Sequence, residues 1–130
     1  MNFSIASVFA CVVYISSSHA QASSADQIQV NPVEFTIDNV KRGRQFYTLH
    51  CVRCHGSDGR GDTEMREFLK TAPADLSDNQ WVYGGTNSII FDVIKQGRLE
   101  RDMPAFDAEL NDERIWQVLR YMEYLGGKRP

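Results

Sequence analysis

Three residues with reactive side chains stand close together near the middle of the chain. Cys51, Cys54 and His55 fit the pattern C-x-x-C-H, which is the attachment pattern of a c-type haem. The two thiols can add across the haem vinyl groups as thioethers, and the adjacent imidazole can then bind the iron from one face. The pattern therefore predicts one covalent haem c, attached through Cys51 and Cys54, with His55 as an iron ligand.

Three other interpretations of the two cysteines compete with haem attachment. A thioredoxin-like dithiol needs a βαβ setting, and none follows in the sequence. A structural zinc site needs a second ligand pair, which the rest of the chain does not supply. A disulfide is also possible, since Cys51 and Cys54 are the only cysteines after the leader described below.

A haem bound by His55 has one open axial position, which a Met, His, Cys or Lys side chain could fill. His50 lies one residue before Cys51, so close to the attachment that it is poorly placed to reach the far face of the haem. We expect His50 to be a partly exposed helix residue. The remaining candidates are Met65, Met103 and Met122.

Met103 is the predicted second ligand. It precedes Pro104 in a loop between two predicted helices, far enough along the chain to reach the other face of the haem. Met65 is only ten residues past His55, and Met122 fits the inward face of the last helix. The alternative role for Met103 is ordinary packing, because Met fills irregular gaps.

The ligand pair carries a prediction about function. A soft thioether favours Fe(II), and two protein ligands leave no position for a substrate. His–Met ligation therefore predicts an electron carrier. The alternative is a haem enzyme or gas sensor with an open or labile distal site.

The first twenty residues have the features of a secretory leader. They contain no Asp, Glu, Lys or Arg, and an apolar stretch from Ile5 to Ile15 is followed by the small residues Ser18 and Ala20. These features predict a signal peptide over residues 1–20. A membrane anchor is the alternative, but eleven apolar residues form about 16 Å of helix, against about 30 Å of hydrocarbon. We therefore expect a soluble periplasmic protein after cleavage.

Charge bears on the partners of the protein. The formal net charge is −3, from 14 Lys and Arg and 17 Asp and Glu, which argues against a nucleic-acid partner. Basic residues nevertheless gather around the attachment pattern, and they form either a solvated helix face or a docking patch for a redox protein. These residues are Lys41, Arg42, Arg44 and Arg53.

Hydrophobic periodicity and capping residues predict an all-α chain of four or five short helices. A first helix covers about 38–50, with Thr36 and Asp38 as candidate N-caps. A short helix is expected over 63–70, with Phe68 and Leu69 facing inward. Thr86 then caps a third helix that ends at about 96.

The last predicted helix follows an irregular loop over 98–110. Asn111 is its expected N-cap, and the acidic residues at 112 and 113 suit the positive end of the helix dipole. One face of this helix is apolar, and Gly126 ends it. The apolar face contains Ile115, Val118, Leu119 and Met122.

In this order the motifs resemble those of class I c-type cytochromes, which are small and soluble. The likeness covers about 38–125 and rests on Gly43, Tyr47, the C-x-x-C-H pattern, the loop 103–106 after Gly97, and the helix 115–121. It implies a small cytochrome c-like fold around one covalent haem, with the first and last helices crossing at Gly43. The expected organisation is a signal peptide over 1–20, an extended N-terminal tail over 21–36 and a cytochrome c domain over 37–127.

The resemblance also implies residues that surround the haem. A backbone carbonyl near Pro73 is expected to accept the Nδ1 proton of His55 and so fix the imidazole. The family usually has its Pro two residues before the position of Leu76, where this chain has Ala74. Candidates to hold the haem propionates, with core or surface positions as the alternative, are Trp81, Tyr83 and Arg98.

The expected function is electron transport by a periplasmic protein that is not itself an enzyme. The haem would accept one electron from a donor protein and deliver it to an acceptor. The few lysines of this chain differ from the lysine ring of many mitochondrial members, which favours a bacterial type. Expected partners of the monomer are a periplasmic dehydrogenase, an oxidase or a reductase.

Overall fold

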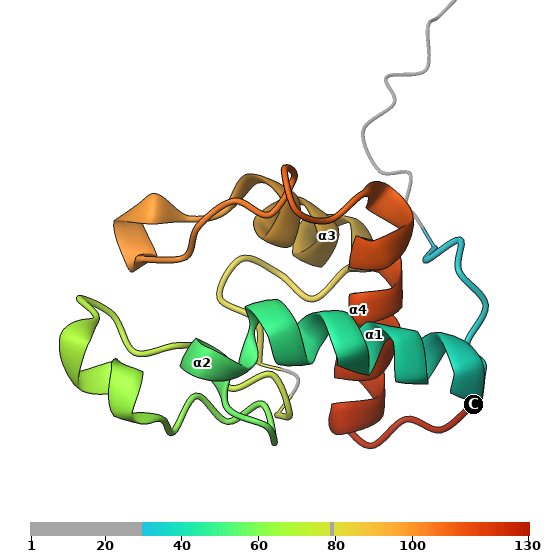
Figure 1. Ribbon diagram of the computed structural model, residues 1–130, viewed down its shortest axis with the longest axis horizontal. Helices are drawn as coiled ribbons and strands as arrows, with labels where there is room; N and C mark the ends of the chain where they lie inside the picture. Colours follow the sequence, from blue (N-terminus) through green and yellow to red (C-terminus); the bar gives the residue numbers. More distant parts are fainter. Residues whose placement is uncertain (1–29, 79) are drawn as a thin grey trace, which may run out of the picture.

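The computed structural model describes residues 30–78 and 80–130. The predicted signal peptide and most of the predicted tail lie outside these residues. Figure 1 shows a helical molecule in which α1 (Ile37–His50) passes across α4 (Asp112–Leu125). Between them come α2 (Val52–His55), α3 (Asn87–Gln96) and two short 3-10 helices, η1 (Glu64–Phe68) and η2 (Leu99–Arg101). The described residues contain no strand beyond one isolated bridge between Arg98 and Met103, so the predicted all-α class is confirmed.

Helix α1 begins where its capping residue predicts. The Thr36 side chain accepts a hydrogen bond from the Asn39 N–H at 3.3 Å, so Thr36 is the N-cap and Asp38 belongs to the first turn. The buried face of α1 consists of Val40, Gly43 and Tyr47. Because α1 leads directly into α2, its orientation determines where the C-x-x-C-H residues lie.

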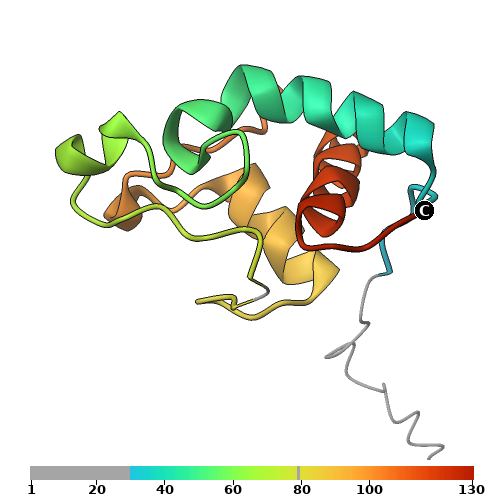
Figure 2. The same ribbon diagram turned by 90° about the horizontal axis from the view of Figure 1, so that it is seen from below.

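The crossing of α1 and α4 forms the base of the core. The rings of Tyr47 and Tyr121 meet edge to face, with centroids 5.1 Å apart, and Gly43 lies against the backbone of Gln117. Figure 2 shows the same crossing from a second direction. One side of α4 borders the cavity described below, which Val118 and Met122 line.

Helices α3 and α4 complete the core. The Thr86 side chain accepts from the Ile89 N–H and the Asn111 side chain from the Arg114 N–H, at 3.4 and 3.0 Å, so both predicted N-caps are confirmed. The rings of Phe91 and Trp116 stack with centroids 4.3 Å apart. The predicted apolar face of α4 is buried, at Ile115, Val118, Leu119 and Met122.

The segment 63–70 differs from its prediction. Only Glu64–Phe68 is helical, as 3-10 helix η1, and Leu69 has an extended backbone with φ −100° and ψ 142°. Successive side chains of an extended chain point to opposite sides, so Phe68 and Leu69 do not share a face. Leu69 is half-buried while 77% of Phe68 is exposed, and the inward prediction for Phe68 was wrong.

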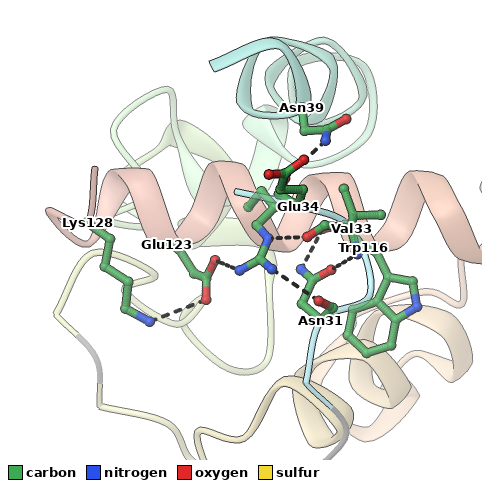
Figure 3. A network of polar contacts seen from close by, with 8 residues as sticks. Asn31, Val33, Glu34, Asn39, Trp116, Glu123 and Lys128 are labelled. Carbon is green, nitrogen blue, oxygen red and sulfur yellow. Dashed lines mark hydrogen bonds and ion pairs between the residues drawn. The ribbon is translucent and has the colours of Figure 1, made fainter. Parts of the chain in front are cut away.

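The described part of the predicted tail lies against α4. Asn31 is buried and donates from its side chain to the Trp116 carbonyl at 2.9 Å. The Arg120 guanidinium donates to the carbonyls of Val33 and Asn31 at 2.7 and 3.1 Å, and it pairs with Glu123 at 2.7 Å (Figure 3). These contacts hold the chain before α1 against α4.

A membrane-spanning helix would need both length and continuous apolar character. None of the helices over 30–78 and 80–130 has both.

Candidate haem site

One cavity of about 420 Å³ opens between α2, the loop after it, α3 and the loop that contains Met103. Its size falls within the range of small-molecule and cofactor sites. Most of its wall is apolar, which suits the flat apolar ring system of a haem. The apolar wall residues include Leu69, Leu76, Ile90, Val93, Ile94, Phe106 and Val118.

The cavity brings together the C-x-x-C-H residues and every predicted pocket residue. Cys51, Cys54 and His55 line one side of it as half-buried residues. The other predicted residues that line the cavity are Pro73, Trp81, Tyr83, Arg98 and Met103. Met65, Met122 and His50 line it as well, so the cavity itself does not separate the three methionines.

The orientation of His55 is fixed by a backbone carbonyl. Its Nδ1 atom lies 3.1 Å from the oxygen of Ala74. Because a carbonyl oxygen only accepts, this contact places the proton on Nδ1 and leaves the Nε2 lone pair free for a metal. Burial lowers the pKa of His55 and the hydrogen bond to Ala74 acts in the opposite direction. A neutral imidazole is the form that ligates iron.

The acceptor is the carbonyl of Ala74, the residue after Pro73, in agreement with the carbonyl expected near Pro73. The Pro73 oxygen faces Gly61 instead, while Pro73 still lines the cavity. Ala74 stands two residues before Leu76, at the position where the family usually has its Pro. The acceptor is a backbone atom, so its position in the loop matters more than its side chain.

The two cysteines are present as thiols without a disulfide between them. Burial, followed by the neighbouring Cys54, raises the pKa of Cys51 to about 12. A thiol with this pKa stays protonated at neutral pH and is a poor nucleophile for dithiol exchange. The part of the chain that the structure describes also holds no group of three or more His, Cys, Asp or Glu side chains able to bind a metal ion. These observations disfavour the dithiol and zinc interpretations.

Met103 is held in place by backbone contacts. The N–H of Arg98 donates to the Met103 oxygen at 2.7 Å, and the N–H of Met103 donates to the Arg98 oxygen at 3.1 Å. Gly97 has φ +69°, and a Cβ atom there would lie 2.5 Å from the Ala105 nitrogen. A residue without a side chain is therefore needed where the Met103 loop passes the end of α3.

An aromatic and cationic cluster lies at the cavity next to this loop. The guanidinium groups of Arg98 and Arg101 lie 5.1 and 5.6 Å from the centre of the Tyr83 ring. The Tyr83 hydroxyl donates to Glu100 at 2.9 Å. Both arginines line the cavity, and paired guanidinium groups suit carboxylates. Sequence reasoning named Arg98 and missed Arg101, for which the i, i+3 spacing was the available signal.

These residues fit a c-type haem. The apolar wall matches its ring system, two thiols lie beside the imidazole that would bind the iron, and a thioether faces the same space. Two arginines can neutralise its carboxylates.

Comparison with known proteins agrees with this assignment. Residues 38–122 match the family model described as cytochrome C oxidase, cbb3-type, subunit III. The FixP subunit of the cbb3-type cytochrome c oxidase from Bradyrhizobium diazoefficiens is 35% identical over 86 residues. This match covers 66% of the chain and 27% of FixP, so the chain spans about a quarter of the length of this relative. A CcoP subunit from Rhodobacter capsulatus is 35% identical over 92 residues, which cover 65% of the chain and 29% of CcoP.

Solved structures show the same fold. Cytochrome c6 from the diatom Phaeodactylum tricornutum is 26% identical, with a TM-score of 0.52 over 67% of this chain and 93% of its own. A chain of the reducing HAO-like protein complex of Kuenenia stuttgartiensis gives a TM-score of 0.68 at 24% identity, over 77% of this chain and 49% of that one. Because the family model covers well over half of the sequence, the chain belongs to the cbb3-type cytochrome c oxidase subunit III family and carries a c-type cytochrome domain that transfers electrons.

Proposed function

We propose that this domain binds a single haem c covalently through Cys51 and Cys54, with His55 and Met103 as the axial ligands. In this role it carries single electrons between redox proteins of the periplasm. The observation that carries the proposal is the cavity itself. It joins both thiols and a neutral, oriented imidazole to a thioether whose backbone is held by Arg98.

The protein residues would tune and protect the bound group. The haem, when bound, supplies a reversible one-electron couple. His55 keeps its orientation through Ala74, and the soft sulfur of Met103 favours the reduced iron. The apolar wall would exclude water, and Arg98 and Arg101, which line the cavity, would hold the haem carboxylates. With both axial positions filled by the protein, the site suits electron transfer and offers no position for a substrate.

The location and partners follow from the leader and the relatives. A signal peptide over residues 1–20 would place the domain in the periplasm, soluble and monomeric after cleavage. The similarity to subunits of cbb3-type oxidases favours a terminal oxidase as the electron acceptor. A periplasmic dehydrogenase or a reductase remains the other class of partner, as donor or acceptor.

Spectroscopy of the protein matured in a periplasm with a haem-attachment system tests the proposal. Pyridine haemochrome analysis should give one haem with two thioether links per chain. The ferric protein should show the weak near-infrared sulfur-to-iron band. Loss of haem attachment in Cys51→Ser plus Cys54→Ser is expected, and colourless folded wild-type protein would refute the proposal.

Variants of the methionines identify the ligand. Met103→Ala should remove the near-infrared band, give high-spin ferric haem and allow rapid CO binding when reduced. Met65→Leu is the matched control, because Met65 lines the same cavity from η1, and it should keep the band. Loss of the band in Met65→Leu with retention in Met103→Ala would assign the ligand to Met65. A wild type that is already high-spin and binds CO would favour the enzyme or sensor alternative.

A further inference from the structure

Asp102, the residue before Met103, has an unusual backbone conformation. Its φ of 59° and ψ of 19° lie in the left-handed region, and no other described residue except glycine has a positive φ. Asp enters this region at less cost than most side chains, although still at a cost compared with glycine. A glycine at this turn would relieve the cost, so the carboxylate is the feature to be explained.

The Asp102 carboxylate reaches a segment 32 residues away in the sequence. One oxygen accepts the Lys70 backbone N–H at 2.7 Å, and the other lies 3.5 Å from the Lys70 Nζ atom. The Asp102 side chain is 24% exposed, whereas that of Lys70 is 77% exposed. The hydrogen bond to the backbone is therefore the stronger part of the contact, because an exposed ion pair is screened by solvent.

This contact joins the segment that orients His55 to the loop that contains Met103. Lys70 belongs to segment 69–74, which lines the cavity and ends at Ala74, the acceptor of the His55 proton. Asp102 directly precedes Met103 and lines the same cavity. Within the described residues, the Lys70 N–H donating to the Asp102 carboxylate is the only hydrogen bond between segments 69–74 and 98–103.

We propose that Asp102 is a positioning residue for Met103. It holds the loop 98–103 against segment 69–74, keeps the thioether directed into the cavity and slows the entry of external ligands. This inference rests on the proposed His–Met ligation. The left-handed backbone at Asp102 directs the carboxylate toward Lys70.

Three substitutions separate the parts of the contact in the holoprotein. Asp102→Gly retains access to the left-handed backbone and removes the carboxylate. Asp102→Asn retains the backbone preference and a neutral acceptor, and it keeps the test valid if the glycine variant does not mature. Lys70→Ala removes the ammonium group with the aliphatic part of the side chain and keeps the backbone N–H donor. Asp107→Asn, at an exposed position of the following loop, controls for the change in charge.

Two measurements report on the proposal. Imidazole can reach the ferric iron only by displacing Met103, so its affinity should rise roughly tenfold in Asp102→Gly, the effect of losing one charge-assisted hydrogen bond. The rise should be smaller in Asp102→Asn and within about twofold for Lys70→Ala and Asp107→Asn. Hydrogen exchange of the Lys70 amide in the reduced protein should speed up by a similar factor in Asp102→Gly alone.

The outcomes distinguish this proposal from the one it rests on. A wild-type protein without the near-infrared band refutes the His–Met ligation and the positioning role with it. A wild type that shows the band, together with unchanged imidazole affinity in Asp102→Gly, refutes the positioning role alone. If Asp102→Asn has a lower imidazole affinity than Asp102→Gly, and the melting temperatures of the two variants are equal, the result supports positioning over a general loss of stability.

Discussion

Gly43 of α1 lies directly against the backbone carbonyl of Gln117 of α4. A methyl group on residue 43 would overlap the Gln117 oxygen and would come within 3.1 Å of the Tyr121 Cβ atom. Neither neighbour can yield by changing a side-chain rotamer, since one is backbone and the other is attached to it. The two helices can cross at this distance only with glycine at position 43.

Gly43→Ala should therefore destabilise the holoprotein. Alanine improves helix propensity by about 1 kcal/mol, but the overlap forces α1 and α4 apart at a cost near the upper end of about 1–3 kcal/mol, which leaves a net loss of about 2 kcal/mol. Guanidinium unfolding followed by circular dichroism measures the difference. Gln45→Ala, at an exposed position of the same helix, is the control. Equal or greater stability of Gly43→Ala would show that helix propensity outweighs the crossing.

Arg120 gives a second prediction about stability. Arg120→Met keeps the length of the side chain but leaves the Val33 and Asn31 carbonyls without their donor and Glu123 without its half-buried partner. We expect a loss of about 2–4 kcal/mol and faster proteolysis before α1. The control is Lys128→Met, which removes the exposed ion pair to the same Glu123 at 3.3 Å and should cost less than about 0.5 kcal/mol. Equal losses in the two variants would contradict the role of Arg120 as the main anchor.

The main helices and their caps could be predicted because their signals are local. Thr86 and Asn111 stand directly before apolar periodic segments, and each caps its helix as expected. Cys51, Cys54 and His55 also form a local pattern. Counting the side chains able to bind iron left three methionines, and the loop position of Met103 favoured it among them. The structure adds that these residues line one cavity.

The remaining features depend on contacts between distant backbone segments. The Ala74 oxygen and the Lys70 N–H belong to the main chain, so no side-chain type marks them in the sequence. Phe68 was misassigned because the predicted helix continues to residue 70, whereas η1 ends at Phe68. Where a helix ends determines whether Phe68 or Leu69 faces inward. Sequence patterns therefore predict the helices here better than the loops that line the cavity.

The buried Tyr47 hydroxyl should make the free energy of unfolding depend on pH in the alkaline range. Its hydroxyl donates to the Gly56 carbonyl at 2.8 Å, and burial, the largest cause, raises the pKa of Tyr47 above its usual value of 10.0. The folded protein therefore holds this proton more tightly than the unfolded chain does. The stabilisation is fully present below pH 10 and is lost as the pH rises through the higher folded-state pKa.

Tyr47→Phe isolates this contribution. At pH 7 the variant should lose about 1 kcal/mol, since the Gly56 carbonyl loses its donor. Above pH 10 the free energy of unfolding should fall less steeply than in the wild type. Some slope should remain, because burial also raises the pKa of Tyr121. Unfolding curves between pH 7 and 11 provide the test, and parallel slopes for the two proteins would exclude Tyr47 as the group responsible.

The last prediction concerns the basic residues beside the attachment site. Lys41, Arg42, Arg44 and Arg53 are all exposed, and Arg53 also lines the haem cavity. If they form a docking patch, electrostatic attraction should speed the encounter with an acidic partner, and salt should slow it. We expect the oxidation of the reduced protein by membranes containing a cbb3-type oxidase, the proposed acceptor, to be roughly tenfold slower at high than at low ionic strength.

Variants that remove the positive charges distinguish a docking patch from a solvated helix face. Lys41→Gln plus Arg42→Gln should lower the rate at low salt and weaken its salt dependence. The matched control is Lys128→Gln plus Arg129→Gln, which removes the same charge at the C-terminal end, after α4. A rate that ignores ionic strength, or that falls equally in both double variants, would assign these four residues to a solvated face. A selective loss in the α1 variant would place the docking surface beside the haem attachment.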